Sequence, residues 1–216
     1  MIAPLAIGLE IGEERRPRNL GAMMRADRFL PLTAFGERIM VCGPSCSGKS
    51  TFATALGASL GAPVIHLDQL RFVPRSDWVK RPDEEFDALH AEAVAGERWV
   101  IEGNYRQQVP LRLTRATGIL ELITGSVPVR LWRYARRTLF EPDRPGALDG
   151  LRDSIKWDMI DWIARREPAR RASYLAMLRQ SGLPMIEVNS MAELRRVYDS
   201  WGLDTAGSRR SQGQAT

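Results

Sequence analysis

From Glu37 onward, short apolar runs alternate with stretches in which apolar residues recur at helical spacing. Apolar runs bounded by Gly, Pro or Asp are typical of buried parallel strands. The five predicted strands are Arg38–Gly43, Pro63–Asp68, Trp99–Gly103, Gly118–Ile123 and Pro184–Asn189. Helical spacing is found at Phe52, Leu56 and Leu60, from Phe86 to Ala93, over Val127–Leu139 and over Ala192–Trp201. Strands that alternate with helices predict an α/β fold, a five-stranded parallel sheet covered by helices on both faces.

Three stretches depart from this alternation. Residues 140–183 form a long, charged, helical insertion, in which Ile155, Trp157, Met159, Ile160, Trp162 and Ile163 are expected to make a small core. Residues 1–36 show no sustained period and are predicted to be a disordered N-terminal extension. Residues 205–216 contain no large apolar side chain and are predicted to be a disordered tail. The predicted domain therefore covers residues 37–204.

Composition narrows the class of protein. A chain of 216 residues, 44% hydrophobic and 26% charged, suits one globular domain and excludes wholesale disorder and fibrous repeats. Its apolar runs are far shorter than the roughly 20 residues that a membrane span needs. The opening MIAPLAIGLEIGEERR is a poor signal peptide, and two cysteines make no disulfide framework. We therefore expect a cytoplasmic protein that does not bind membranes.

A net charge of +5 is a feature that nucleic-acid-binding proteins often share. The densest basic stretch is 130–179, with twelve Arg and Lys against seven acidic residues. Of the 31 basic residues in the chain 28 are Arg, which is equally consistent with a general compositional bias. The sequence contains no helix-turn-helix, zinc motif or basic helix free of acids. DNA is thus an alternative partner without a motif that supports it.

The most informative motif follows the first predicted strand. GPSCSGKS, from Gly43 to Ser50, fits the phosphate-binding loop (P-loop) pattern G-x-x-x-x-G-K-[ST]. Its glycines let the backbone bend so that N–H groups point at phosphate oxygens, and the helix that follows adds its positive dipole end. Lys49 would reach the β- and γ-phosphates, and Ser50 would bind Mg²⁺. The predicted nucleotide-binding residues are Gly43, Pro44, Ser45, Cys46, Ser47, Gly48, Lys49, Ser50 and Thr51.

The two cysteines lie beside this motif. Cys42 closes the strand, and Cys46 lies inside the loop. A helix N-terminus lowers the pKa of a nearby thiol, which would make Cys46 reactive. The favoured interpretation is that both cysteines are small residues that fill a tight turn.

The second and third predicted strands also end on polar residues. Ligands of open parallel sheets gather beyond the carboxyl ends of the strands, which places Asp68 near the phosphates. Asp68 would position Mg²⁺ through water or accept a proton from an attacking hydroxyl, or else merely cap the turn. Gly103, Asn104 and Tyr105 follow the third strand and would bind the phosphate acceptor or form a plain turn. His66 is expected to be packed or hydrogen-bonded.

Three arginines follow the fourth predicted strand at spacing i, i+3 and i+7. Arg130, Arg133 and Arg137 therefore share one face of a helix. Such a face at the entrance of a nucleotide site would clamp phosphates and neutralise the charge that develops during transfer. The alternative is an ordinary solvated charged face.

Together these motifs resemble the adenylate kinase-like P-loop proteins. Over residues 37–203 the chain is most similar to the bacterial DNA topology modulation (FlaR-like) proteins. The motifs that carry this resemblance are GxxxxGKST, HLD at strand two, WVIEGNY at strand three, LWRxxxR after strand four and the Arg-rich insertion. The resemblance implies a three-layer, nucleoside monophosphate kinase-like P-loop NTPase fold, with a helical lid at about residues 140–166. It also implies ATP at the P-loop, an acceptor near Asp68 and Gly103–Tyr105, and Arg133 and Arg137 at the lid base.

One position departs from the family pattern. Where the fourth strand of such proteins usually ends in L-D-x-P, this chain reads LITGS, so that Thr124 stands in place of a Walker B-type Asp. Glu121 is on the same strand but several residues early. Help to the metal would then fall to Ser50 and Asp68.

The sequence thus predicts an ATP-binding kinase. It would transfer the γ-phosphate, with Mg²⁺, to a small acceptor such as a nucleoside monophosphate, and its predicted catalytic residues are Lys49, Asp68, Arg133 and Arg137. The alternative is an ATP-binding regulatory or DNA-topology-associated protein with slow ATPase activity, which Thr124 and the basic stretch 130–179 favour.

Overall fold

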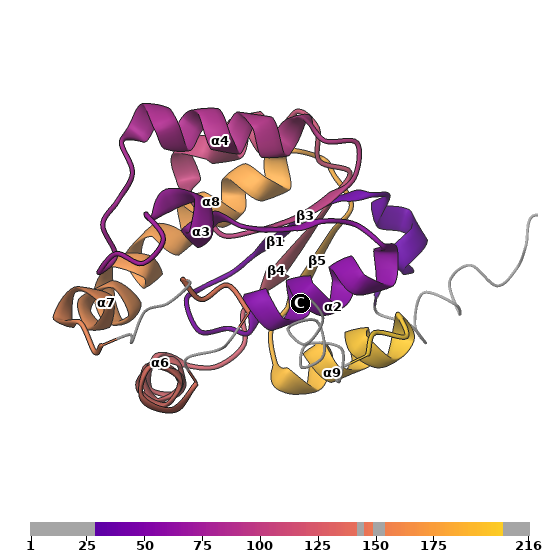
Figure 1. Cartoon of the computed structure of the whole chain (residues 1–216). Coiled ribbons are helices and arrows are strands. Elements are labelled where there is room, and N and C mark those ends of the chain that lie inside the picture. Colours follow the sequence, from indigo (N-terminus) through magenta and orange to yellow (C-terminus); the bar gives the residue numbers. More distant parts are fainter. Residues whose placement is uncertain (1–28, 142–144, 149–153, 205–216) are drawn as a thin grey trace, which may run out of the picture. The chain divides into compact units, whose positions relative to one another are not determined.

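A computed structural model describes residues 29–141, 145–148 and 154–204 (Figure 1). Its five strands are all parallel and lie in the order β2-β3-β1-β4-β5. They are β1 (Arg38–Cys42), β2 (Val64–His66), β3 (Trp99–Glu102), β4 (Gly118–Leu122) and β5 (Met185–Val188). Each lies within its predicted run, so the predicted α/β fold with a five-stranded parallel sheet is confirmed. The strand that leads into the P-loop, β1, lies in the middle.

Helices connect successive strands. The α-helices are α2 (Lys49–Leu60), α3 (Leu67–Arg71), α4 (Asp83–Ala95), α5 (Val109–Leu113), α6 (Val127–Phe140), α7 (Trp157–Asp161), α8 (Glu167–Gln180) and α9 (Met191–Ser200). Two 3₁₀ turns, η1 (Leu32–Phe35) and η2 (Arg106–Gln108), and one π-helical turn, η3 (Trp162–Arg166), complete the described elements. None of the described helices is long and apolar enough to cross a membrane.

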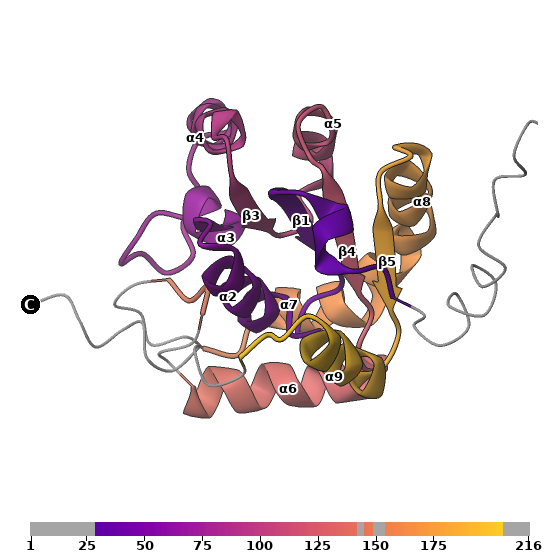
Figure 2. The same cartoon turned by 90° about the vertical axis from the view of Figure 1, so that its right-hand side faces the viewer.

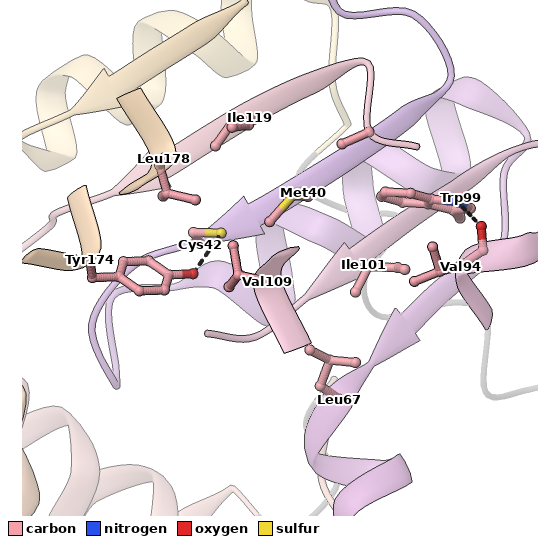
Figure 3. Close-up of a cluster of buried hydrophobic side chains, with 11 residues drawn as sticks. Met40, Cys42, Leu67, Val94, Trp99, Ile101, Val109, Ile119, Tyr174 and Leu178 are labelled. Carbon is pink, nitrogen blue, oxygen red and sulfur yellow. Dashed lines mark hydrogen bonds between the residues drawn. The ribbon is translucent and has the colours of Figure 1, made fainter. Parts of the chain in front are cut away.

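Helices cover both faces of the sheet, which gives three layers (Figure 2). Because successive side chains of a strand point to opposite faces, Met40 and Cys42 of β1 face α4, α5 and α8. There they join a buried cluster with Ile101, Ile119 and Leu178 (Figure 3). On the other face, the Phe52 ring of α2 packs 5.3 Å from that of Tyr198 and 6.2 Å from that of Trp201. Both β1 faces are thus buried, which fixes where its carboxyl end lies.

The insertion is built differently from the prediction. Trp157 is 83% exposed and Ile155 is 46% exposed, so the prediction that both belong to a small core is wrong. Ile163 is buried, but the rest of the insertion continues into α8, which packs on the sheet through Tyr174 and Leu178. The described part of the insertion thus contacts the main core through α8, while Trp157 and Ile155 stay exposed. Residues 142–144 and 149–153 of the predicted lid lie outside the described residues.

Ordered structure begins before residue 37. Phe35 is fully buried, and its ring centroid lies 5.3 Å from that of Trp201. The backbone of β4 comes so close that a Cβ on Gly118 would lie 2.8 Å from the Phe35 Cβ. The turn η1 is therefore part of the core. Most of the predicted extension, residues 1–28, and the predicted tail, residues 205–216, lie outside the described residues.

Phe35→Ala tests this contribution. Removing a fully buried phenylalanine leaves a cavity against Trp201, so we expect the free energy of unfolding to fall by about 3–5 kcal/mol, measured by urea denaturation. Thr33→Ala, an exposed change in the same turn, is the control and should have little effect. A Phe35→Ala protein as stable as the control would show that η1 is not part of the folded core.

Candidate functional site

The loop between β1 and α2 has the tight backbone that its sequence predicts. Gly43 has φ 136°, and a Cβ there would lie 2.3 Å from the Leu122 carbonyl oxygen, so no other residue fits. Gly48 has φ 94°, and Cys46 adopts the left-handed region with φ 62°. The chain can therefore reverse from strand to helix within a few residues.

The start of α2 is open toward an anion. Gly48 is its N-cap and provides no side-chain cap, and no acidic residue lies in the first turn. The first amides of a helix have no partner within the helix and favour negative charge. Among the described residues, the buried Ser47 Oγ also has no hydrogen-bond partner. Donors of this kind, at a Gly-rich loop that starts a helix, fit a bound phosphate chain.

Glu102, at the carboxyl end of β3, is central to the polar cluster beside this loop. Its carboxylate is 3.8 Å from Lys49 Nζ, accepts a hydrogen bond of 3.3 Å from Ser50 Oγ, and lies 3.1 Å from His66 Nδ1. Glu102 is only 6% exposed. Burial opposes its charge, but the hydrogen bond from His66 and the charge of Lys49 prevail, and the pKa of Glu102 is lowered. An ionised carboxylate therefore lies beside the P-loop lysine and serine.

Asp68 lies on the other side of the same cluster, in the first turn of α3. Its Oδ1 accepts a hydrogen bond of 2.6 Å from Tyr105 OH. Although the residue as a whole is exposed, desolvation of its carboxyl group together with the charge of Glu102 raises its pKa. Lys49 and Arg137 act in the opposite direction. Two neighbouring carboxyls thus have pKa values moved in opposite directions, an arrangement typical of acid–base sites.

The loop after β3 is held rigidly. The Asn104 side chain donates to Gly43 O (2.8 Å) and accepts from Gly43 N (3.0 Å), which ties this loop to the P-loop. Arg112, fully buried, donates to the carbonyls of Gly103 (2.7 Å), Asn104 and Tyr105 (3.2 Å). Of the three predicted acceptor-binding residues, Gly103 and Asn104 therefore shape the loop, and Tyr105 contacts Asp68 with its hydroxyl group.

Arg130, Arg133 and Arg137 of α6 lie on the side of the P-loop, but each makes different contacts. Arg130 is buried in an ion pair with Glu167. Arg133 NH1 donates to Cys46 O (3.3 Å) and to Thr124 O (3.2 Å). Arg137 stacks on the Tyr134 ring at 5.7 Å, and among the described residues its buried Nε has no hydrogen-bond partner. Arg137 also acts electrostatically on Asp68. Of the three arginines on this face, it is therefore the one best placed to donate hydrogen bonds to a ligand.

Thr124 and Glu121 do not supply the missing Walker B carboxylate. Thr124 is buried and donates to Ser47 O at 2.5 Å. Glu121 is buried inside the sheet, where its Oε1 pairs with Arg171 at 3.1 Å. Burial raises the pKa of Glu121 to about 7. The carboxylate beside Ser50 comes instead from Glu102, on the opposite neighbour of β1.

The cysteines fit the prediction that they are packing residues. Burial raises the pKa of the Cys42 thiol to about 12, and its Sγ lies 3.3 Å from Tyr174 OH (Figure 3). Burial also raises the pKa of Cys46, in spite of Arg137 and Lys49 nearby. Raised pKa values leave little thiolate, so neither thiol is activated.

Within the predicted lid, the segment 145–148 lies beside the cluster. A Cβ on Gly146 would be 3.1 Å from His66 Nδ1 and 3.2 Å from Ser50 Oγ. Gln69 of α3 donates to Ala147 O at 2.9 Å. Residues 145–148 therefore pass directly beside the P-loop serine, where a bulkier chain would not fit.

Sequence reasoning assigned no role to Glu102, Arg112 or Glu167. An acidic residue at the end of the third strand was visible in the sequence. Its relevance depends on β3 lying next to β1, which no local pattern reveals. Arg112 and Glu167 act through contacts between elements that are distant in sequence.

Comparison with known proteins adds a likeness of fold. No protein-family model matches the chain, and no curated protein is a significant match. It is similar to the shikimate kinase of Acinetobacter baumannii in complex with shikimate (18% identity, TM-score 0.49, 76% of this chain and 89% of that one). It is also similar to the shikimate kinase of Bacteroides thetaiotaomicron (17%, 0.47, 77% and 99%) and a gluconokinase of Sinorhizobium meliloti (18%, 0.39, 76% and 95%). Membership of the FlaR-like family stays a prediction.

The buried Glu121 yields a prediction about pH. Its folded-state pKa of about 7 exceeds the ordinary 4.5, so the folded state favours the protonated form. Stability from this group is present at low pH and is lost as pH rises through about 7. The Gln side chain of the Glu121→Gln variant stays neutral at every pH. When the pH is raised from about 5 to about 8, the free energy of unfolding should therefore fall by up to about 3 kcal/mol more in the wild type than in the variant.

Urea denaturation at both pH values measures this difference. Glu84→Gln, an exposed change on α4, is the matched control and should follow the wild type. Equal pH dependence in wild type and Glu121→Gln would contradict the raised pKa.

Proposed function

We propose that this protein is a kinase that transfers the γ-phosphoryl group of ATP to a hydroxyl or phosphate oxygen of a small molecule. The observation that carries the proposal is one cluster with two chemical halves. Lys49, Ser50 and Glu102 lie at the P-loop, and Asp68 with Tyr105 lies at the adjoining strand end. The first half suits a nucleotide phosphate chain, and the second suits the group that attacks it.

Magnesium fits the first half. Mg²⁺ prefers oxygen ligands and is usually held by one or two carboxylates, a hydroxyl and substrate phosphates. Ser50 Oγ and the Glu102 carboxylate, 3.3 Å apart, are such a pair. Among the described residues no three His, Cys, Asp or Glu side chains converge as a metal cage. When bound, the ion would neutralise charge on the phosphates. Asp68, the other predicted ligand, would reach it through water.

The chain's own residues supply the remaining chemistry. Lys49 would neutralise charge on the transferring group, and Arg137 would approach the same group from α6. Asp68, with its raised pKa, would accept the proton of an attacking hydroxyl as the new O–P bond forms and ADP departs. Tyr105 fixes the orientation of that carboxylate. Nucleoside monophosphates are the first acceptors to test.

The basic stretch 130–179 gives less support to the DNA-associated alternative. Many of its charges are already paired with acidic side chains of this chain, through Arg130–Glu167, Arg136–Glu141, Lys156–Asp77, Arg166–Asp161, Arg171–Glu121 and Arg179–Glu187. DNA binding depends on cations free to replace the counterions of phosphates. These pairings therefore favour the kinase.

An acceptor panel tests the proposal. ADP release would be followed with Mg²⁺ and ATP or GTP, alone and with nucleoside monophosphates, nucleosides and small hydroxy acids or sugars. We expect strong stimulation by one acceptor, which Lys49→Ala abolishes because the phosphate chain loses its main cation. Lys80→Ala, an exposed lysine, is the control. Bound nucleotide with a slow rate indifferent to every acceptor would instead favour the regulatory alternative.

Glu102→Gln tests whether the Glu102 carboxylate takes part in phosphoryl transfer. Removing the charge beside Ser50 should lower kcat by about 10²–10³-fold, because the metal and Lys49 both lose their counter-charge. Higher Mg²⁺ should partly restore the rate. Glu92→Gln on the exposed side of α4 should be unaffected. A Glu102→Gln enzyme with normal kcat and normal Mg²⁺ dependence would remove Glu102 from the site.

A further inference from the structure

Glu167 brings a carboxylate from a distant helix onto the P-loop. It is the first residue of α8, directly after the π-helical turn η3, and is 8% exposed. Its Oε1 accepts hydrogen bonds from Ser45 N at 2.7 Å and Ser45 Oγ at 3.1 Å. Its Oε2 is paired with Arg130 of α6, which is itself buried. A buried carboxylate thus bonds directly to the backbone of the phosphate-binding loop.

The bonded amide belongs to the same peptide unit as the carbonyl that holds Lys49. Lys49 Nζ donates to Pro44 O at 3.0 Å, and Pro44 C=O and Ser45 N–H are the two ends of one planar peptide group. In a trans peptide these two ends point in opposite directions. Fixing the N–H toward Glu167 therefore fixes the C=O toward Lys49.

From this geometry we propose that Glu167 is a positioning residue for Lys49, which it orients through the Pro44–Ser45 peptide. The Arg130 ion pair holds the carboxylate in place, and the guanidinium also lies 3.5 Å from both Ser45 O and Ile163 O. The consequence for catalysis rests on the proposed kinase function. The orientation of Lys49 does not depend on that function and can be measured separately.

Breaking the ion pair at one end alone would leave a buried charge without a partner and would destabilise the fold. The test therefore uses two double variants, Arg130→Met/Glu167→Gln and Arg130→Met/Glu167→Leu. Both lack the ion pair and both place a side chain of similar size at 167. They differ in one respect, because Gln retains a carbonyl oxygen that can accept from Ser45 N, whereas Leu has none.

The first readout is the acylation rate of Lys49 in the nucleotide-free protein, followed by mass spectrometry. The chain has only three lysines, and Lys80 and Lys156 serve as internal standards. The Lys49 side chain is 11% exposed. We expect its acylation to be several-fold faster in the Leu variant than in the Gln variant, with the two standards unchanged. Equal Lys49 rates in the matched pair would overturn the proposal, whether or not the protein is a kinase.

The second readout separates positioning from general stability. Once an acceptor is known, we expect kcat of the Leu variant to be about tenfold below that of the Gln variant, with little change in the KM for ATP. Thermal denaturation should give similar midpoints for the two variants. Equal kcat values would overturn the proposal. Tighter ATP binding by the Leu variant would also overturn it, because Glu167 would then be competing with a phosphate for the Ser45 amide.

Discussion

The backbone carbonyls of the P-loop, from residue 43 to residue 48, are all hydrogen-bonded, and these bonds set the shape of the loop. Buried backbone oxygens rarely go unpaired, and here the partners come from α2, from α6 and from the segments after β3 and β4. The donors to the carbonyls of residues 43 to 48, in order, are Asn104, Lys49, Arg130, Arg133, Thr124 and the amide of Phe52. The loop is therefore held by the segments after β3 and β4 and by α6, so its shape depends on the whole sheet.

This support explains why the arginines of α6 are not equivalent. Arg130 and Arg133 both donate to loop carbonyls, and because Arg130 is paired with Glu167, the fixed positive charge held against the loop is that of Arg133. Such preorganised charge costs no rearrangement when a ligand arrives. Glu167 compensates the most buried of them, Arg130, and also takes one loop amide. The ion pair therefore contacts the loop as well as joining α6 to α8, and buried pairs of this kind usually add only modest net stability.

The strands and the P-loop were predictable because their signals are local. Apolar runs bounded by turn residues mark all five strands, and the P-loop pattern itself specifies a glycine at 43. The partners of the loop were not predictable in this way. Glu102 matters because β3 lies beside β1, and Glu167 matters because α8 returns to the loop after a long insertion. Both depend on strand order and packing, and the three-dimensional arrangement is needed to see them.

Strand order also explains how a carboxylate can lie beside Ser50 without a Walker B-type acid at position 124. The central strand β1 has two neighbours, β3 and β4, and the carboxyl ends of both lie beside the P-loop. An acid at position 124 would bring a carboxylate close to Ser47 O, where Thr124 now donates a hydrogen bond. With the carboxylate placed on β3, the β4 end is free to support the loop, and Glu102 still lies 3.3 Å from the Ser50 hydroxyl. Thr124 therefore does not leave Ser50 without a neighbouring carboxylate, and it is as compatible with the proposed kinase as with a slow ATPase.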